Sequence, residues 1–105
     1  MLSINNQALP LPSSLDYAFF APLSGGGTST LLRVLAQWQA LTPAQTALVC
    51  GLAGGSFTLA CRDPRTDAWR GFPAHMTTCD IRVLEAQAGE ASLMRLTLTI
   101  DESQI

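Results

Sequence analysis

The sequence predicts a small α+β domain, in which a mostly antiparallel β-sheet forms a barrel or sandwich and one short helix packs across it. Residues 92–101 alternate between apolar and polar side chains, as in a strand with one buried face. Residues 42–55 contain a helix start followed by a glycine stop. The remainder consists of short strand-like runs bounded by Asn, Asp, Gly and Pro. A chain of 105 residues can bury a core, so residues 1–105 are expected to form a single domain.

The N-terminal segment begins with a short apolar strand. Residues 2–4 are Leu-Ser-Ile, and residues 5–7 are Asn-Asn-Gln, which is typical of a turn. Residues 8–12 are expected to be extended, because Pro10 and Pro12 exclude a helix and confine the segment to a sheet edge or a loop.

An aromatic strand and a glycine-rich loop follow. Residues 15–20 form the strand, with Tyr17 and Phe19 on one face and Phe20 on the other. Three consecutive glycines then predict a mobile loop: Gly25, Gly26 and Gly27. The loop lacks the GxxxxGK[ST] and GxGxxG patterns of phosphate-binding loops, so phosphate binding is not favoured.

Residues 30–41 carry two competing signals. Their Leu, Ala and Gln content favours a helix. The alternation of Leu32, Val34, Ala36 and Trp38 with the residues between them favours a strand. We favour the strand, because the next segment has a helix start of its own and two helices separated by one Thr would need a sharp break.

The helix is predicted to begin at Thr42. Thr42 can cap it, Pro43 suits the first helical position, and Gln45 can complete a capping box. Gly54 and Gly55 end it about ten residues later. Four apolar residues are expected to share the face that packs on the sheet: Ala44, Ala47, Leu48 and Leu52.

The C-terminal half predicts four extended segments after the helix, the last of which is the alternating segment of residues 92–101. Residues 56–62 form a strand with Phe57, Leu59 and Cys61 on one face, and residues 63–67 form a turn in which Asp63 and Pro64 set the geometry.

Residues 69–76 are interrupted by Gly71 and Pro73, which indicates an edge strand or a bulge. Residues 77–84 alternate, with three side chains expected to point inward: Cys79, Ile81 and Val83.

The composition bears on which partners the protein could have. Charged residues make up 13% of the chain, about half of the usual ~25%. Either partners cover much of the surface, or the chain is a monomer with a Ser-, Thr- and Gln-rich exterior. All six cations are arginines, spread along the chain, and the net charge is −2. Nucleic acid is therefore not expected as a partner, because phosphate binding needs a basic face.

No membrane or export signal is apparent. No apolar run approaches the ~20 residues needed to span a bilayer, and the residues after Met1 do not resemble a signal peptide. The three cysteines are irregularly spaced and do not indicate a disulfide framework. We therefore expect a reducing compartment and no membrane partner.

The residues that could carry chemistry are better explained as structural. Cys61, His75 and Cys79 contain only one close ligand pair, whereas zinc sites usually have two. Both cysteines are expected to be buried thiols on apolar strand faces. A nucleophile pair of His75 with Cys79 or Cys50 lacks an orienting third group. We expect no metal and no cofactor.

The carboxylates are also expected to be structural. Asp63 and Asp67 lie in a turn, and Asp101 and Glu102 lie near the end of the chain. Carboxylates in such positions are usually solvated rather than paired for acid–base catalysis. The sequence therefore predicts a protein that is not an enzyme.

The aromatic residues leave a binding function open. Trp69 and Phe72 flank the predicted turn, where they could stack on a sugar or another ligand. A carbohydrate- or ligand-binding β module is therefore the alternative function. Large aromatic residues in a small β domain more often form the core and subunit contacts.

The order of the motifs resembles a group of small phage and prophage tail proteins. That group begins with an INGxxxPxPSS strand and continues through WxxLT, a short helix, an FxVxYxDPxTG strand and turn, and RxGxF, before an alternating final strand. In this chain, Asp67 occupies the position of the glycine that ends the DPxTG turn of that group. The matching segments are residues 2–5 (LSIN), 9–14 (LPLPSS), 38–42 (WQALT), 57–66 (FTLACRDPRT), 70–72 (RGF) and 96–102 (LTLTIDE).

The resemblance implies a structural virion protein of a phage tail or phage-derived particle, near the tape measure and the distal tail or baseplate. Such a protein would work in a ring of copies, contact other tail proteins, and be assembled in the bacterial cytoplasm. It would have no catalytic residues. Edge strands suit this role, because they offer unpaired backbone groups and a head-to-tail contact can close into a ring.

Three contact regions are expected from this interpretation: the aromatic strand, the glycine loop and the turn after residue 62. Their residues are Tyr17, Phe19, Phe20, Gly25, Gly26, Gly27, Asp63, Arg65, Trp69 and Phe72.

Overall fold

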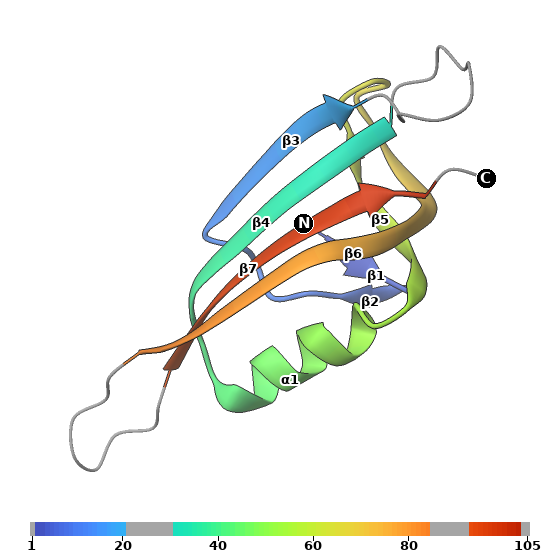
Figure 1. The fold of residues 1–105 in the computed structure, drawn as a ribbon. Coiled ribbons are helices and arrows are strands. Elements are labelled where there is room, and N and C mark those ends of the chain that lie inside the picture. Colours follow the sequence, from blue (N-terminus) through green and yellow to red (C-terminus); the bar gives the residue numbers. More distant parts are fainter. Residues whose placement is uncertain (1, 21–30, 85–92, 104–105) are drawn as a thin grey trace.

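The structure is a computed structural model that describes residues 2–20, 31–84 and 93–103. These residues form seven strands and one helix (Figure 1). In chain order the elements are β1 (Ser3–Ile4), β2 (Gln7–Ala8), β3 (Ser14–Phe20), β4 (Leu31–Leu41), α1 (Pro43–Leu52), β5 (Ser56–Asp63), β6 (Ala68–Leu84) and β7 (Leu93–Glu102).

All seven strands belong to one antiparallel sheet, in the order β2-β1-β5-β6-β7-β4-β3. The sheet curls, since Tyr17 on β3 lies close enough to Cys61 on β5 to affect its pKa although three strands separate them in the sheet order. It does not close, since β2 and β3 remain its two ends. The predicted fold class, a mostly antiparallel sheet with one short helix packed against it, is confirmed.

The segment of residues 30–41 forms strand β4, as favoured from its alternation. Its even-numbered apolar residues are buried: Leu32, Val34, Ala36 and Trp38. The Trp38 Nε1 donates to the carbonyl oxygen of Pro10 at 2.8 Å. This bond satisfies a buried indole N–H and fixes the proline-containing segment before β3 against the core.

Helix α1 begins as predicted. The Thr42 hydroxyl accepts from the backbone N–H of Gln45 at 3.2 Å, and the Gln45 side chain accepts from the backbone N–H of Thr42 at 3.0 Å. Pro43 occupies the first turn. The helix ends at Leu52, and Gly55 follows with a φ of 68°, a left-handed conformation that glycine adopts without strain.

The predicted face of α1 is wrong. The helix contacts β4 and β7, but it buries Thr46 and Val49. Thr46 is accommodated because its hydroxyl donates to the carbonyl oxygen of Thr42 at 3.0 Å. Of the four residues expected to face the sheet, Leu52 is half-buried and three are exposed: Ala44, Ala47 and Leu48. The apolar pattern of this alanine-rich helix did not distinguish the two faces.

Residues 69–76 and 77–84 form one long strand, β6. The prediction of an edge strand is confirmed for residues 69–72, because β5 pairs with them on one side and β7 pairs with β6 only from Ala74 onward. The pairing with β7 does become irregular, between Met76 and Thr78. Figure 1 shows β6 and β7 continuing together past the end of β5.

The core lies between the curled sheet and α1. The alternation of β5 and β7 is confirmed, since Phe57, Leu59 and Cys61 are buried on one strand and Leu96, Leu98 and Ile100 on the other. Burial of these side chains supplies the main stabilisation of the fold. The largest fully buried side chains are Trp38, Leu2, Ile4, Leu32, Leu59, Leu96, Leu98 and Ile100.

Candidate interaction surfaces

The aromatic strand β3 presents its three aromatic residues in different ways. Tyr17 is half-buried against the core, and burial raises the pKa of its hydroxyl. Phe20 lies under the guanidinium group of Arg33, 4.7 Å from ring centroid to Cζ. Phe19 keeps 49% of its surface exposed. Phe19 is therefore the aromatic residue of this strand that is most available to a partner.

The predicted glycine loop, Gly25–Gly27, lies outside the described residues.

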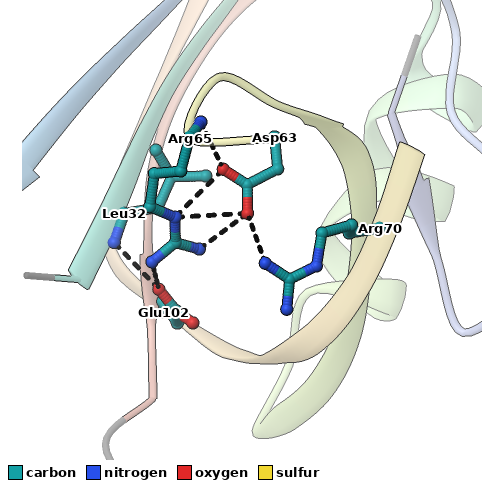
Figure 2. Close-up of polar contacts among 5 residues, drawn as sticks. All are labelled: Leu32, Asp63, Arg65, Arg70 and Glu102. Atoms are coloured by element: carbon teal, nitrogen blue, oxygen red, sulfur yellow. Dashed lines mark hydrogen bonds and ion pairs between the residues drawn. The ribbon is translucent and has the colours of Figure 1, made fainter. Parts of the chain in front are cut away.

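The turn between β5 and β6 is built around Asp63, which is fully buried. One carboxylate oxygen, Oδ1, accepts from the backbone N–H of Arg65 at 2.9 Å and from its Nε at 3.0 Å. The other, Oδ2, accepts from the Nη2 of Arg65 at 2.8 Å and from the Nη1 of Arg70 at 3.2 Å. Figure 2 shows both guanidinium groups converging on this carboxylate.

Arg65 also joins this turn to the last residue of β7. Its Nη1 donates to the Oε1 of Glu102 at 2.9 Å. The same Glu102 oxygen accepts from the backbone N–H of Leu32 at 3.0 Å (Figure 2). The cluster therefore connects the β5–β6 turn with β7 and the start of β4.

The electrostatics of this cluster favour a structural role. Hydrogen bonds from Arg65 hold the pKa of Asp63 below its usual range, although burial acts in the opposite direction. The pKa of Arg65 is raised, chiefly by its hydrogen bond to Asp63. A carboxylate that stays ionised and accepts five hydrogen bonds is a poor general acid or base at neutral pH. The expectation that the turn and terminal carboxylates are solvated is wrong for Asp63 and for Asp101, which is 4% exposed.

Trp69 and Phe72 do not form a joint stacking platform. They are three positions apart on β6 and therefore lie on opposite faces of the sheet. Trp69 is 53% exposed, whereas Phe72 is 6% exposed and lies 6.0 Å from the Arg65 guanidinium. Asp63 and Phe72 are therefore buried supports of the turn rather than contact residues, whereas Arg65 and Trp69 are exposed.

The cysteines and the histidine are not gathered at one place. Cys61 is buried, and burial raises the pKa of its thiol to about 11. Cys79 is exposed, and partial burial together with the neighbouring Cys50 of α1 raises the pKa of its thiol. The His75 Nδ1 lies 3.0 Å from the Ser103 hydroxyl. Across the described parts of the chain, no group of three His, Cys, Asp or Glu side chains is placed to hold a metal ion.

The exposed part of β6 is the surface that the sequence did not predict. Cys79, Ile81 and Val83 were expected to point into the core, but all three are exposed. They do lie on the core face, because the register places Ile81 opposite the buried Leu96. Alternation predicts which face a residue occupies, but it does not show whether anything covers that face.

Comparisons with known proteins add no relatives: no family model, no curated protein and no solved structure matches this chain. Within the described residues, no helix has the length and apolar character needed to cross a membrane.

Proposed function

We propose that this chain is a structural protein of a phage tail or phage-derived particle, where it assembles with further copies into a ring and contacts neighbouring tail proteins. The observation that carries the assembly part is that the sheet has several strand edges without a partner, of which two are the longest. The first is β3, the last strand in the sheet order. The second is the outer part of β6, beyond the point where β5 stops. The order of motifs that resembles small tail proteins supports the class of protein.

Two different free edges favour a ring over a simple pair. Strand addition at an exposed edge supplies backbone hydrogen bonds between chains. A contact between two different edges of successive copies is heterologous, and it forms a ring when the rotation between copies closes. Exposed side chains on these edge strands provide further contact area, among them Phe19, Ile81 and Val83.

The low content of charge supports an assembled protein. Most arginines in the described residues already pair with a carboxylate of the same chain. Exposed apolar side chains remain on β3 and β6, which is typical of surfaces that other proteins cover.

The composition of purified particles tests this function. Particles are collected after prophage induction in the bacterium that encodes the chain, and the chain is quantified in them by mass spectrometry. We expect it in the particles in several copies, together with tail proteins. Its confinement to the soluble fraction, with no copies in any particle, would contradict the proposal.

Trp69 keeps the ligand-binding alternative open, because it is the exposed one of the two tryptophans. Trp38 is buried, so a change of tryptophan fluorescence on adding a ligand would report mainly on Trp69. Quenching by a sugar that disappears in Trp69→Phe would support this alternative. A panel of glycans without any response would remove it.

A further inference from the structure

The two free edges are similar in length and are both accessible. β3 extends over Ser14–Phe20 and pairs with β4 on one side only. β5 pairs with β6 only up to the contact of Ser56 with His75. Residues 76–84 of β6 therefore have β7 as their single neighbour in the sheet. Every residue from 77 to 83 is exposed.

Apolar side chains accompany both edges on the core face. Ile81 and Val83 are 45% and 66% exposed, and they lie opposite Leu96 and Met94 of β7. Phe19 on β3 is 49% exposed and lies opposite the buried Leu32 of β4. The apolar core thus continues outward to each edge, where it is left uncovered.

The charges on the other face of the two edges are complementary. Asp16 is the acidic residue of β3 and has no ion pair among the described residues. On the hairpin of β6 and β7, Arg82 lies directly opposite Arg95. The Nε of Arg95 is buried without a hydrogen-bond partner in the described structure. Arg82 meets only Asp80, at 3.5 Å and with both side chains largely exposed.

From these features we infer that β3 of one copy adds to the outer part of β6 of the next copy, antiparallel, with Tyr17 opposite Ile81. The inference rests on the proposed ring assembly and specifies its contact. Asp16 then lies opposite Arg82, beside Arg95, which relieves two neighbouring positive charges. On the core face, Leu15 meets Val83 and Phe19 meets Cys79.

Neighbouring registers are less favourable. A shift by one residue places apolar side chains of one copy beside polar side chains of the other, because the faces alternate with a period of two. A shift by two residues in one direction places Asp16 opposite Asp80, and like charges directly opposite each other are destabilising. A shift by two in the other direction moves Asp16 away from Arg82 to Leu84. The Tyr17–Ile81 register satisfies both faces.

The direction of the strands agrees with a ring. The strands β6, β7, β4 and β3 alternate in direction, so β3 is antiparallel to β6 within one copy. A rotation about an axis along the strands preserves these directions and keeps the core face on the same side. β3 of one copy therefore meets β6 of the next in the antiparallel sense, as the register requires.

The stagger between copies is also compatible with closure. Within one copy, Tyr17 pairs with Val34 and Val34 pairs with Ile100, so Tyr17 is at the height of Ile100 on β7. Ile81 pairs with Leu96 of the same strand. Successive copies are thus displaced along the strands by four residues of β7, which is about 13 Å. Across the strands, one copy contributes four strands, which is about 19 Å. These displacements correspond to strands tilted by roughly 35°, the lower end of the range for closed barrels.

A charge exchange tests the contact. The variants are Asp16→Arg, Arg82→Asp and the double variant, and sedimentation velocity over a concentration series gives their association constants. Each single variant places like charges opposite each other and is expected to weaken association about tenfold or more. The double variant is expected to recover it, and so is an equimolar mixture of the two single variants, in which every contact again joins opposite charges.

Arg62→Asp is the matched control, because the side chains of Arg62 and Arg82 are both 70% exposed. It is expected to associate like the wild type. Thermal melts check that all variants are folded.

Three results would overturn the inference: a monomeric wild type, single variants that associate normally, or failure of the double variant to recover. If association is weakened in Arg82→Asp but not in Asp16→Arg, the contact instead joins the β6 edges of two copies about Ile81, with Asp80 opposite Arg82. If these variants contradict the contact while the chain is present in purified particles, the contact is wrong and the proposed function stands. Absence from particles removes the function regardless of the variants.

Discussion

Asp63 supports the turn between β5 and β6 as a buried, ionised carboxylate. We predict that Asp63→Asn lowers the free energy of unfolding by about 3 kcal/mol, because the guanidinium groups of Arg65 and Arg70 lose their anionic partner. Urea denaturation measures the change. Asp67→Asn is the matched control, since Asp67 is an exposed turn carboxylate and asparagine tolerates its φ of 53°. Equal stability of the two variants would contradict the structural role of Asp63.

The same residue predicts how stability depends on pH. The pKa of Asp63 is lowered in the folded chain, so its contribution is fully present above the unfolded value of ~3.9. The contribution is lost as pH falls through the lower folded pKa, where the unfolded chain has already taken up the proton. We expect the wild type to lose stability steeply below about pH 4. The acid limb of Asp63→Asn should be shallower, and acid limbs of the same slope would count against this linkage.

The three cysteines should differ in reactivity. Cys61 is buried with a pKa of about 11, whereas Cys79 is exposed. Because the thiolate is the reactive form, a maleimide at pH 8 is expected to modify Cys79 well before Cys61 in the folded chain. Peptide mapping by mass spectrometry follows each site, and Cys79→Ser is the control. Modification of Cys61 at the rate seen in denaturant would show that β5 does not bury it.

At the level of elements, the start of α1 is the best-defined local feature. We predict that Thr42→Ala destabilises the protein by about 1 kcal/mol, because the Gln45 backbone N–H loses its acceptor. Thr42→Ser keeps the hydroxyl and should restore most of the stability. Chemical denaturation of the two variants and the wild type is the measurement. Identical losses for Ala and Ser would show that the cap contributes nothing.

The elements that could be predicted from the sequence are those with local causes. Thr42 and Gln45 are three residues apart and hydrogen-bond to each other, so the helix start could be predicted from four consecutive residues. The alternation of apolar and polar residues in β4 and β7 likewise predicts which face of each strand is buried. The face of α1 was not readable, since Thr46 is buried only because of where the helix lies on the sheet.

The candidate surfaces depended still more on distant contacts. From the sequence, Asp63 is an ordinary turn residue. Its main partner Arg65 is only two residues away, but the Arg65 guanidinium also binds Glu102, which is distant in the sequence. The exposure of Ile81 follows from the end of β5, which lies in another part of the sequence. The alternation of residues 77–84 correctly predicted the face on which Ile81 lies, but it did not predict that this face is uncovered there.

For the molecule as a whole, the arrangement of charge and edges is asymmetric. One end of the sheet carries Asp16 on a free strand, and the outer part of β6 carries Arg82 beside Arg95. Chains with two complementary, different edges associate head to tail rather than face to face. Screening by salt should therefore weaken the association, although the apolar contacts of Phe19 and Ile81 would persist.

The mass of the chain in solution tests this account most directly. Sedimentation velocity over a wide concentration range, with native mass spectrometry at the same concentrations, would detect assembly of the 11.2 kDa chain. We predict a closed oligomer of one defined size whose population grows with concentration. A monomer at every concentration, which also fails to bind neighbouring tail proteins, would contradict it.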